Sequence, residues 1–454
     1  MNFTKAIETT FKKVLPSPFT IAVLLTIFTF IISFFFTKEN TVNHLSNLAS
    51  YWEKGIWSSK LLVFAYQMIL ILVLGHVLVL SKPIDKLITR LVTHTKSTTT
   101  AVVLVSFSTI LVAFINWGLG LIFGAIMVRK VAEYAQQNNI AINYPIIGAA
   151  GYVGLMVWHS GISGSAPLDA AGSGRIRELL TNTSINSTSL PNAIDTSSTI
   201  FSYWNLIIFG VILFAVPTFL FFLAKKAKPT PINLPTYQYS LKPTNVNGVE
   251  KLDHSKVFSL IFGIIILLVF CLQYGANALQ LNFTLNAINF LMLGLAIIFH
   301  GSFYSFLKAL EEAIKGTSGI LIQFPLYFGI MGIMTSTGMV SEISDYFIAI
   351  SNETTLPILT FFSAGLVNIF VPSGGGQWVI QGPIVLESAI KLGVSLPKAV
   401  MALAYGDQIT NMLQPFWALP LLGITKLKAR EILPYTILLM LLGTIIYIGG
   451  LLIF

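Results

Sequence analysis

Apolar stretches long enough to cross a lipid bilayer recur along the whole 454-residue chain. About 20 apolar residues in a helix span the hydrocarbon core, and lipid offers the backbone no hydrogen-bonding partner, so each stretch is expected to be helical. Only 10% of the residues are charged, against about 25% in soluble proteins. We therefore predict an all-α polytopic membrane protein, with full crossings at 19–36, 61–81, 144–170, 199–224, 257–276, 286–300, 317–338, 397–424 and 432–453.

Two further apolar segments, about 101–135 and about 356–391, are each too long for one helix and are broken near the middle. We predict that both are re-entrant hairpins, which enter the membrane and return to the same side. The second contains FVPSGGGQWVIQGPIV, in which three glycines follow Pro372. Each glycine costs a helix interior about 1 kcal/mol relative to alanine, and unpaired amides in a bilayer are tolerated only beside protein or a water-filled cavity. The break therefore predicts a functional site.

The basic residues give the predicted orientation. With these crossings, twenty of the 27 lysines and arginines fall on the N-terminal side and seven, Lys60 among them, on the other, and none is needed in the membrane core. Basic loops mark the cytoplasm, so the N-terminus is expected there and the C-terminus outside. Residues 1–18 are predicted to be an amphipathic segment on the membrane surface, and 225–256 a cytoplasmic linker.

The linker separates two halves that repeat the same order of parts, 19–224 and 257–454. FINWGLGLIFGAI, from Phe114, aligns with the stretch from Phe370, and an interrupted helix follows each hairpin, at about 144–170 and about 397–424. Corresponding crossings differ by an odd number, which predicts an inverted-topology repeat. Paired interrupted helices in inverted halves are typical of the midplane site of a secondary transporter. Close packing of glycine-rich helices is the plainer alternative, but it does not explain the shared order of parts.

Three motifs carry a resemblance to a known family: VPSGGGQWVIQGP, INWGLGLIFGA and WHSGISGSAPL. Together they make the chain similar to the bacterial short-chain fatty acid transporters, which are related to a wider ion-transporter superfamily. The resemblance implies uptake of small monocarboxylates, such as acetoacetate or butyrate, across the bacterial plasma (inner) membrane. It also implies a scaffold with a mobile transport domain, often in a homodimer, and no cofactor.

A short-chain acid needs a few donors for its carboxylate and an apolar pocket for its tail. Both hairpin tips precede a new helix, whose first amides present the positive end of the helix dipole, and glycine lets an anion approach them. Trp117 and Trp378 are placed against the tail or, alternatively, are packing residues. The predicted substrate-binding residues are Asn116, Trp117, Gly118, Gly120, His159, Ser160, Ser373, Gly374, Gly375, Gly376, Gln377 and Trp378.

The second interrupted helix carries a group of polar residues that we predict to couple an ion: Asp407, Gln408, Asn411 and Gln414. Ionisable side chains inside a membrane are costly and so default to functional hypotheses. Asp407 is expected to bind H+ or Na+ or, alternatively, to cap the interrupted helix. His159 is either a substrate donor, a proton carrier or a packing residue. The ligands of a bound Na+ are left open.

Other functions fit the sequence less well. A dicarboxylate carrier, the nearest alternative, would need a second set of anion donors or a core cation. No zinc-protease motif and no serine–lysine pair with a core lysine is present, and the lone Cys271 excludes a cysteine metal cluster, so we expect no enzyme. A channel does not require paired interrupted helices. The net charge of +9 fits cytoplasmic loops and gives no reason to expect nucleic acid as a partner.

Overall fold

The computed structural model describes residues 16–37, 43–180, 191–234, 248–279, 284–315 and 317–454. Most of the predicted surface segment 1–18 and the middle of the predicted linker 225–256 lie outside the described residues. The described part of the chain is mostly helical and contains no strand. This agrees with the predicted all-α class.

Six helices of the described residues are long and apolar enough to cross a membrane: α2 (Pro18–Phe36), α4 (Ser59–Val79), α6 (Thr98–Ile115), α11 (Tyr203–Lys226), α13 (Lys256–Leu279) and α22 (Ala429–Ile453). Local chemistry fixes several of their starts. Ser17 precedes α2 and its hydroxyl accepts from the Thr20 amide, while Pro18 occupies the first helical position, where its missing amide costs nothing. The chain is a multi-pass membrane protein.

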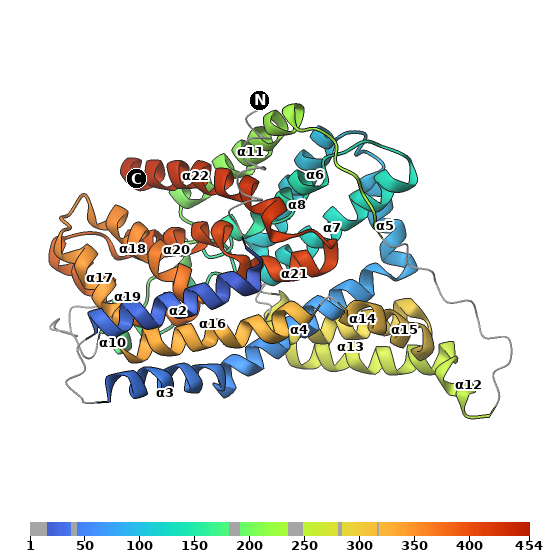
Figure 1. The fold of residues 1–454 in the computed structure, drawn as a ribbon, viewed down its shortest axis with the longest axis horizontal. Coiled ribbons are helices and arrows are strands. Elements are labelled where there is room, and N and C mark those ends of the chain that lie inside the picture. The colour runs from blue at the N-terminus through green and yellow to red at the C-terminus, as the bar shows by residue number, and fades with distance from the viewer. Residues whose placement is uncertain (1–15, 38–42, 181–190, 235–247, 280–283, 316) are drawn as a thin grey trace.

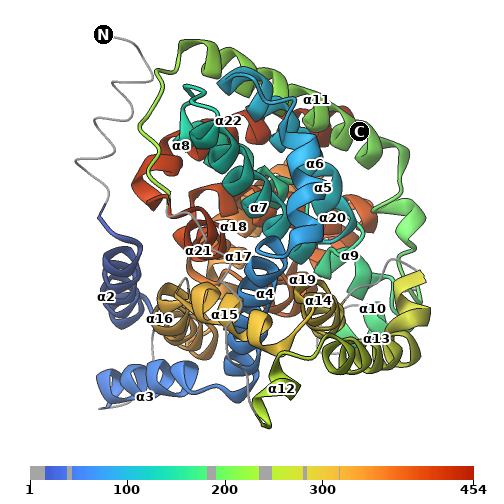
Figure 2. The ribbon, with the colours of Figure 1, turned by 90° about the vertical axis from the view of Figure 1, so that its right-hand side faces the viewer.

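The helices form two layers, which Figures 1 and 2 show from two sides. The lower layer of Figure 1 contains α2, α3 (His44–Ile56), α4, α13, α14 (Leu285–His300), α15 (Phe303–Ile314) and α16 (Ser318–Ser336). Within it α16 packs on α3 and α2, while α14 packs on α13 and α4. Glycines allow the closest of these contacts, since a Cβ on Gly332 would lie 2.4 Å from the Tyr51 carbonyl oxygen.

The upper layer contains both predicted hairpins and both interrupted helices, together with α11, α17 (Met339–Ala349) and α22. In the first hairpin α6 packs on α7 (Trp117–Gln137), and only Asn116 separates the two helices. In the second, α18 (Leu356–Phe370) and α19 (Gly374–Leu392) are joined by 371–373. Whether the hairpins are re-entrant and the halves inverted stays a prediction, as do the domain limits.

The two interrupted helices differ in how much they are interrupted. The first consists of α8 (Tyr144–Ala150), the 3₁₀ turn η1 (Val153–Met156), irregular backbone, and α9 (Ser165–Ala170). The second runs from α20 (Leu396–Thr410) through the 3₁₀ turn η4 (Asn411–Leu413) into α21 (Pro415–Thr425). Each places polar backbone among helices that are otherwise apolar.

Shorter helices complete the described chain: α5 (Lys82–Val92), α10 (Arg175–Leu179), η3 (Thr196–Ser198) and α12 (Glu250–Asp253). The first part of the linker is held against the upper layer. The Asn143 side chain donates to the Lys228 carbonyl at 2.7 Å, and the Tyr144 amide donates to the Thr230 hydroxyl at 3.0 Å. The linker therefore anchors the start of the first interrupted helix.

Candidate functional site

A cavity of about 180 Å³ lies where the two layers meet. The lower layer contributes residues of α4 and α16, and the upper layer contributes both hairpin tips and both interrupted helices. The lining residues are Lys60, Leu61, Phe64, Trp117, Leu155, Trp158, Ser165, Phe328, Met331, Pro372, Ser373, Gly374, Gly375, Phe416 and Trp417. A cavity of this volume holds more than one water molecule and suits a small solute.

The second hairpin tip forms one wall of this cavity. Ser373 is the N-cap of α19 and its hydroxyl oxygen accepts from the Gly376 amide at 3.2 Å. Gly374 and Gly375 occupy the first helical positions, whose amides have no intrahelical acceptor. A Cβ on Gly374 would lie 2.6 Å from Trp158 Cη2 and 2.8 Å from His159 Cε1. Glycine at 374 is thus required by close contact with the first interrupted helix.

The first hairpin tip is tied down by its own hydrogen bonds. Asn116 is buried and its side-chain oxygen accepts from the Leu119 amide at 3.0 Å, so it is the N-cap of α7. The Trp117 amide donates to the Ser163 hydroxyl at 3.0 Å. Only the Trp117 side chain of this tip reaches the cavity.

The glycines of the first tip serve helix packing. Gly120 packs against Ala113 of the neighbouring helix, where a Cβ would lie 2.4 Å from the alanine Cα. A Cβ on Gly118 would be 3.5 Å from Ile288 of α14. Neither residue lines the cavity, although both were predicted to bind substrate.

Aromatic rings cover the apolar side of the cavity. Trp117 meets Trp417 edge to face, with ring centroids 5.3 Å apart, and its centroid lies 6.0 Å from that of Trp158. The predicted Trp378 is not part of this wall. It is buried in a separate cluster, and its indole N–H donates to Asp169 Oδ2 at 2.8 Å.

A buried histidine–aspartate pair joins the two interrupted helices. His159 Nδ1 and Asp407 Oδ2 are 2.5 Å apart, and both side chains are fully buried. The Ala166 amide donates to His159 Nε2 at 3.0 Å, and an amide cannot accept, so Nε2 carries no hydrogen. The ring hydrogen is then on Nδ1 and donates to Asp407. The histidine is neutral and Asp407 Oδ2 is an acceptor in this arrangement.

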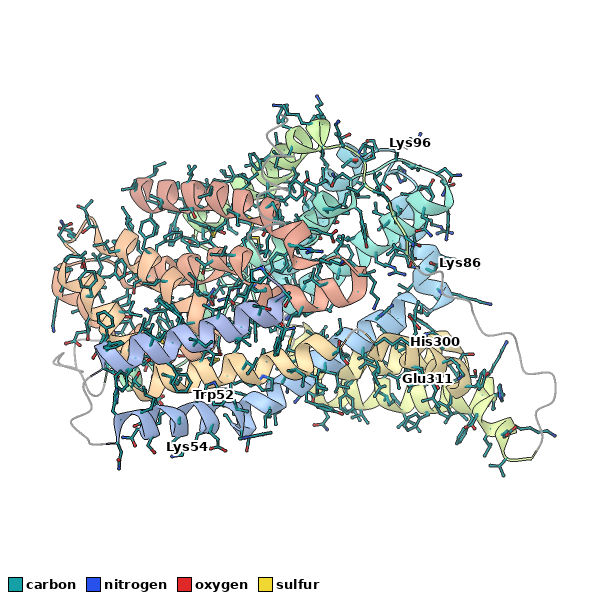
Figure 3. All side chains as sticks on the ribbon, in the orientation of Figure 1. Trp52, Lys54, Lys86, Lys96, His300 and Glu311 are labelled. Carbon is teal, nitrogen blue, oxygen red and sulfur yellow. The ribbon has the colours of Figure 1, made fainter. Side chains whose placement is uncertain are left out.

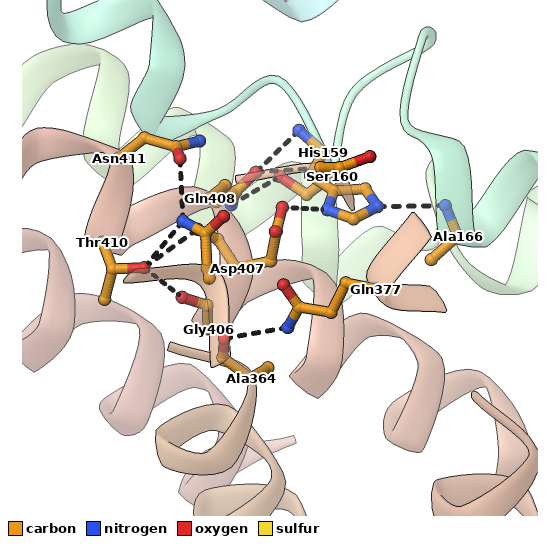
Figure 4. A network of polar contacts seen from close by, with 12 residues as sticks. His159, Ser160, Ala166, Ala364, Gln377, Gly406, Asp407, Gln408, Thr410 and Asn411 are labelled. Atoms are coloured by element: carbon orange, nitrogen blue, oxygen red, sulfur yellow. Dashed lines mark hydrogen bonds and ion pairs between the residues drawn. The ribbon is translucent and has the colours of Figure 1, made fainter. Parts of the chain in front are cut away.

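The second oxygen of Asp407, Oδ1, is buried and has no hydrogen-bond partner among the described residues, and the same is true of Gln377 Oε1. Figure 4 shows the side-chain oxygen of Gln377 pointing toward the Asp407 carboxylate. The Gln377 amide nitrogen is already used, since it donates to the Ala364 carbonyl and to Gln381. Both oxygens are therefore buried acceptors without a donor among the described residues.

The other predicted polar residues of the second interrupted helix form hydrogen bonds with backbone and side-chain groups of neighbouring segments. Gln408 Oε1 accepts from the amides of His159 and Ser160, each at 2.9 Å, and Gln408 Nε2 donates to the Ser160 hydroxyl. Asn411 Oδ1 accepts from Asn368, and Gln414 donates to the Asn368 carbonyl. Gln408 therefore caps the interruption of the first half from the second half.

The structure separates the predicted residues into three groups. Trp117, Ser373, Gly374 and Gly375 line the cavity. His159, Ser160, Gln377, Asp407, Gln408 and Asn411 lie in the adjoining network drawn in Figure 4, and Gln414 joins it through Asn368. Asn116, Gly118, Gly120, Gly376 and Trp378 do not line the cavity, and they cap or pack the hairpins.

Several residues of the site were missed by the sequence analysis. Asn368 donates to the Asp407 carbonyl at 2.8 Å, and its position within an apolar helix was a signal that could have been read. Lys60 was placed outside the membrane and Trp158 was not singled out, yet both line the cavity. Only the three-dimensional packing of α4 against the hairpin tips brings Lys60 to the site.

The whole chain, residues 1–454, matches the model of a family described as short chain fatty acid transporter. A protein of Escherichia coli (strain K12) is 34% identical over 450 residues, which cover 97% of this chain and 96% of that protein. A protein of Haemophilus influenzae is 36% identical over 451 residues, which cover 98% of this chain and 97% of that protein. Both relatives carry provisional names as short-chain fatty acid transporters.

Two solved structures of transporters are also similar over nearly the whole chain. The YdaH transporter of Alcanivorax borkumensis, described as having an unusual topology, is 12% identical with a TM-score of 0.42 and covers 96% of this chain and 98% of its own. The second structure is MtrF of Neisseria gonorrhoeae, which is reported to illuminate a class of antimetabolite efflux pumps. It is 13% identical to this chain, with a TM-score of 0.42. That match covers 98% of this chain and 97% of MtrF.

Proposed function

The chain belongs to the short-chain fatty acid transporter family, and from this premise we propose that it takes up small monocarboxylates, such as butyrate or acetoacetate, together with a proton. The membrane-spanning helices and the family support transport and give no reason to expect catalysis. The identities of the substrate and of the coupled cation are inferred from the cavity and from the buried His159–Asp407 pair.

The observation that carries the proposal is the position of the cavity. It lies against both hairpin tips and both interrupted helices, and its lining combines aromatic residues with Gly374 and Gly375, the first two residues of α19. Amides at a helix start and glycine without a side chain suit a carboxylate, and the rings suit a short apolar tail. The small volume suits a short chain better than a long one.

Uptake of an anion into a negatively charged interior requires a cation to move with it, because each elementary charge costs about 2.3 kcal/mol per 100 mV. We assign the proton to Asp407 Oδ1. Protonation there keeps the His159 contact intact and turns an unpartnered buried acceptor into a donor, and the side-chain oxygen of Gln377, also an acceptor without a partner among the described residues, points toward this carboxylate (Figure 4). A proton on His159 Nε2 would instead displace the Ala166 amide.

Other titratable groups of the elements packed around α20 have different partners. Tyr405 donates to Asn205, Tyr447 donates to the Met156 carbonyl, and Asp169 is paired with Arg175. Lys391 and Glu387 of α19 are paired with each other. Among these groups His159 alone contacts the Asp407 carboxylate. We therefore assign proton coupling to the His159–Asp407 pair.

The test is uptake of radiolabelled butyrate and acetoacetate by the purified protein in liposomes. An inward proton gradient and an inward sodium gradient are imposed separately, at the same membrane potential. We expect accumulation with the proton gradient alone. Accumulation with sodium alone would assign the coupling to Na+, and competition by succinate stronger than that by butyrate would favour a dicarboxylate carrier.

A further inference from the structure

Lys60 stands out among the residues that line the cavity, because it is the one charged side chain among the described lining residues. It is exposed to solvent and forms no hydrogen bond or ion pair with another described residue. It also lies in the first turn of α4, which contains no acidic residue. A cation is unfavourable at that end of a helix, where the dipole favours negative charge. A residue that breaks a local rule without visible compensation is a candidate for function.

Trp158, on the opposite layer, also lines the cavity and lacks a partner. Its side chain is 5% exposed, and its indole nitrogen Nε1 is buried without a hydrogen-bond acceptor among the described residues. Indole nitrogen can only donate, so the missing group is an acceptor. A buried donor left unpaired destabilises the folded state. Because Nε1 has almost no accessible surface, an acceptor in the cavity reaches it only when the Trp158 ring shifts, and binding would then remove the penalty.

We propose that Lys60 and Trp158 form the carboxylate subsite of the cavity, with the Lys60 ammonium as the counter-ion and the Trp158 indole N–H as a second donor. The inference rests on the proposed function and deepens it. The substrate's tail then lies against the aromatic residues Phe64, Phe328 and Trp417. One cation in an otherwise uncharged lining balances one carboxylate, which favours monocarboxylates over dicarboxylates.

The subsite also joins the two layers. Lys60 belongs to α4 of the lower layer, while Trp158 lies in the first interrupted helix of the upper layer and touches Gly374 of the second hairpin. A carboxylate held by both residues contacts both layers in this arrangement. A movement of one layer away from the other would separate the two donors and weaken binding.

Equilibrium binding of radiolabelled butyrate to the purified protein tests the subsite. Lys60→Met is expected to weaken butyrate binding at least tenfold, whereas Lys60→Arg, which keeps the charge, should stay within a few fold of the unchanged protein. Competition by butyramide, which has the same tail and no charge, should be equal in Lys60→Met and in the unchanged protein. Trp158→Phe should weaken butyrate binding several fold.

Lys54→Met is the matched control, since Lys54 is a lysine of α3 that does not line the cavity (Figure 3). Gel-filtration profiles of all variants report on folding. Undiminished butyrate binding by Lys60→Met would overturn the subsite and leave Lys60 as a lysine at the membrane surface, while uptake by the unchanged protein still upheld the proposed function. Absence of butyrate binding and uptake in the unchanged protein would instead reject the proposed function.

Discussion

The two hairpin tips occupy corresponding places in the sequence repeat, but their surroundings differ. In the first tip, Asn116 caps the returning helix, the Trp117 amide is bound by Ser163, and Gly120 packs within the hairpin. In the second tip, Ser373, Gly374 and Gly375 line the cavity, and the two glycines present helix-start amides. One tip is closed by its own contacts and the other is open to a small solute.

The interrupted helices differ in the same direction. The interruption of the first half is long, and Gln408 of the second half holds the amides of His159 and Ser160. The interruption of the second half is a single 3₁₀ turn followed by Gln414. The buried Asp407 lies in the last turn of α20, just before this interruption. The two halves therefore share the order of their parts but differ in role. The second hairpin tip contributes most of the cavity lining from the tips, while the first tip is held mainly by its own packing and hydrogen bonds.

The strongest test of this difference is the loss of the Asp407 charge. Asp407→Asn keeps the shape and the oxygen that accepts from His159, but it removes the proton site. We expect gradient-driven butyrate accumulation to fall to the level of liposomes without protein, while exchange of internal for external butyrate persists, because exchange moves no net proton.

Asp345→Asn, at an exposed aspartate of α17, serves as the control. A variant Asp407→Asn that still concentrates butyrate under a proton gradient would reduce Asp407 to a structural cap of the interrupted helices.

The predicted inversion of the halves can be tested by labelling. Asn138→Cys, at the end of α7, and Lys391→Cys, at the end of α19, each in a Cys271→Ala background, place a thiol at the exposed end of each hairpin, away from the cavity that the tips share. The inverted repeat predicts that a membrane-impermeant maleimide reaches Lys391→Cys from outside and Asn138→Cys from the cytoplasmic side. Labelling of both thiols from the same side only would rule out opposite entry of the hairpins.

The helical class and the polar breaks were predictable because they follow from local rules. Apolar length predicts spanning helices, and Pro372 with the following glycines predicts the break at the second tip. The roles of single residues were less predictable. Trp378 and Trp117 are indistinguishable in the sequence, yet one is bound to Asp169 in a separate cluster and the other faces the cavity.

The residues that were missed depend on contacts distant in sequence. Lys60 reaches the site because α4 lies beside hairpin tips that are over 50 and over 300 positions away in the numbering. The buried pair likewise joins residues 248 positions apart. Periodicity and composition describe one segment at a time, so they hold no information on such pairs.

Within the second tip, the neighbouring glycines are expected to differ in substrate binding. A Cβ at Gly374 would overlap Trp158 and His159, whereas a Cβ at Gly375 has ordinary contacts, the nearest at 3.7 Å from Ser165. We expect Gly374→Ala to weaken butyrate binding by about tenfold or more, since displacement in a packed site typically costs about 1–3 kcal/mol. Gly375→Ala should stay within a few fold, and Gly375→Val, whose side chain is bulkier, should lose binding.

These affinities are measured by equilibrium binding, with thermal unfolding as the check on folding. Equal affinities for Gly374→Ala and Gly375→Ala would argue against the close contact between the second tip and the first interrupted helix.

Within the first tip, glycine substitutions are expected to change stability instead of binding. A Cβ on Gly120 would lie 2.8 Å from the Ala113 backbone nitrogen, so Gly120→Ala should destabilise the protein by about 1–3 kcal/mol. Gly118→Ala is the control, because its nearest contact would be 3.4 Å and alanine is the better helix former. Thermal unfolding in detergent should show a lower midpoint for Gly120→Ala only. A Gly120→Ala protein as stable as the control would show that the two helices can separate without cost.

The smallest expected effects come from the two N-caps, and they compare the tips directly. Asn116→Ala and Ser373→Ala each remove the acceptor for one amide of the returning helix, Leu119 and Gly376 respectively, so each should cost about 1 kcal/mol of stability. Only Ser373 also lines the cavity, so Ser373→Ala should in addition weaken butyrate binding a few fold, while Asn116→Ala leaves it unchanged once the folded fraction is accounted for. Unfolding midpoints and butyrate dissociation constants measured on the same preparations separate the two effects. If both variants lost affinity equally, the first tip would contribute to the site as much as the second, and the unequal division between the halves would be wrong.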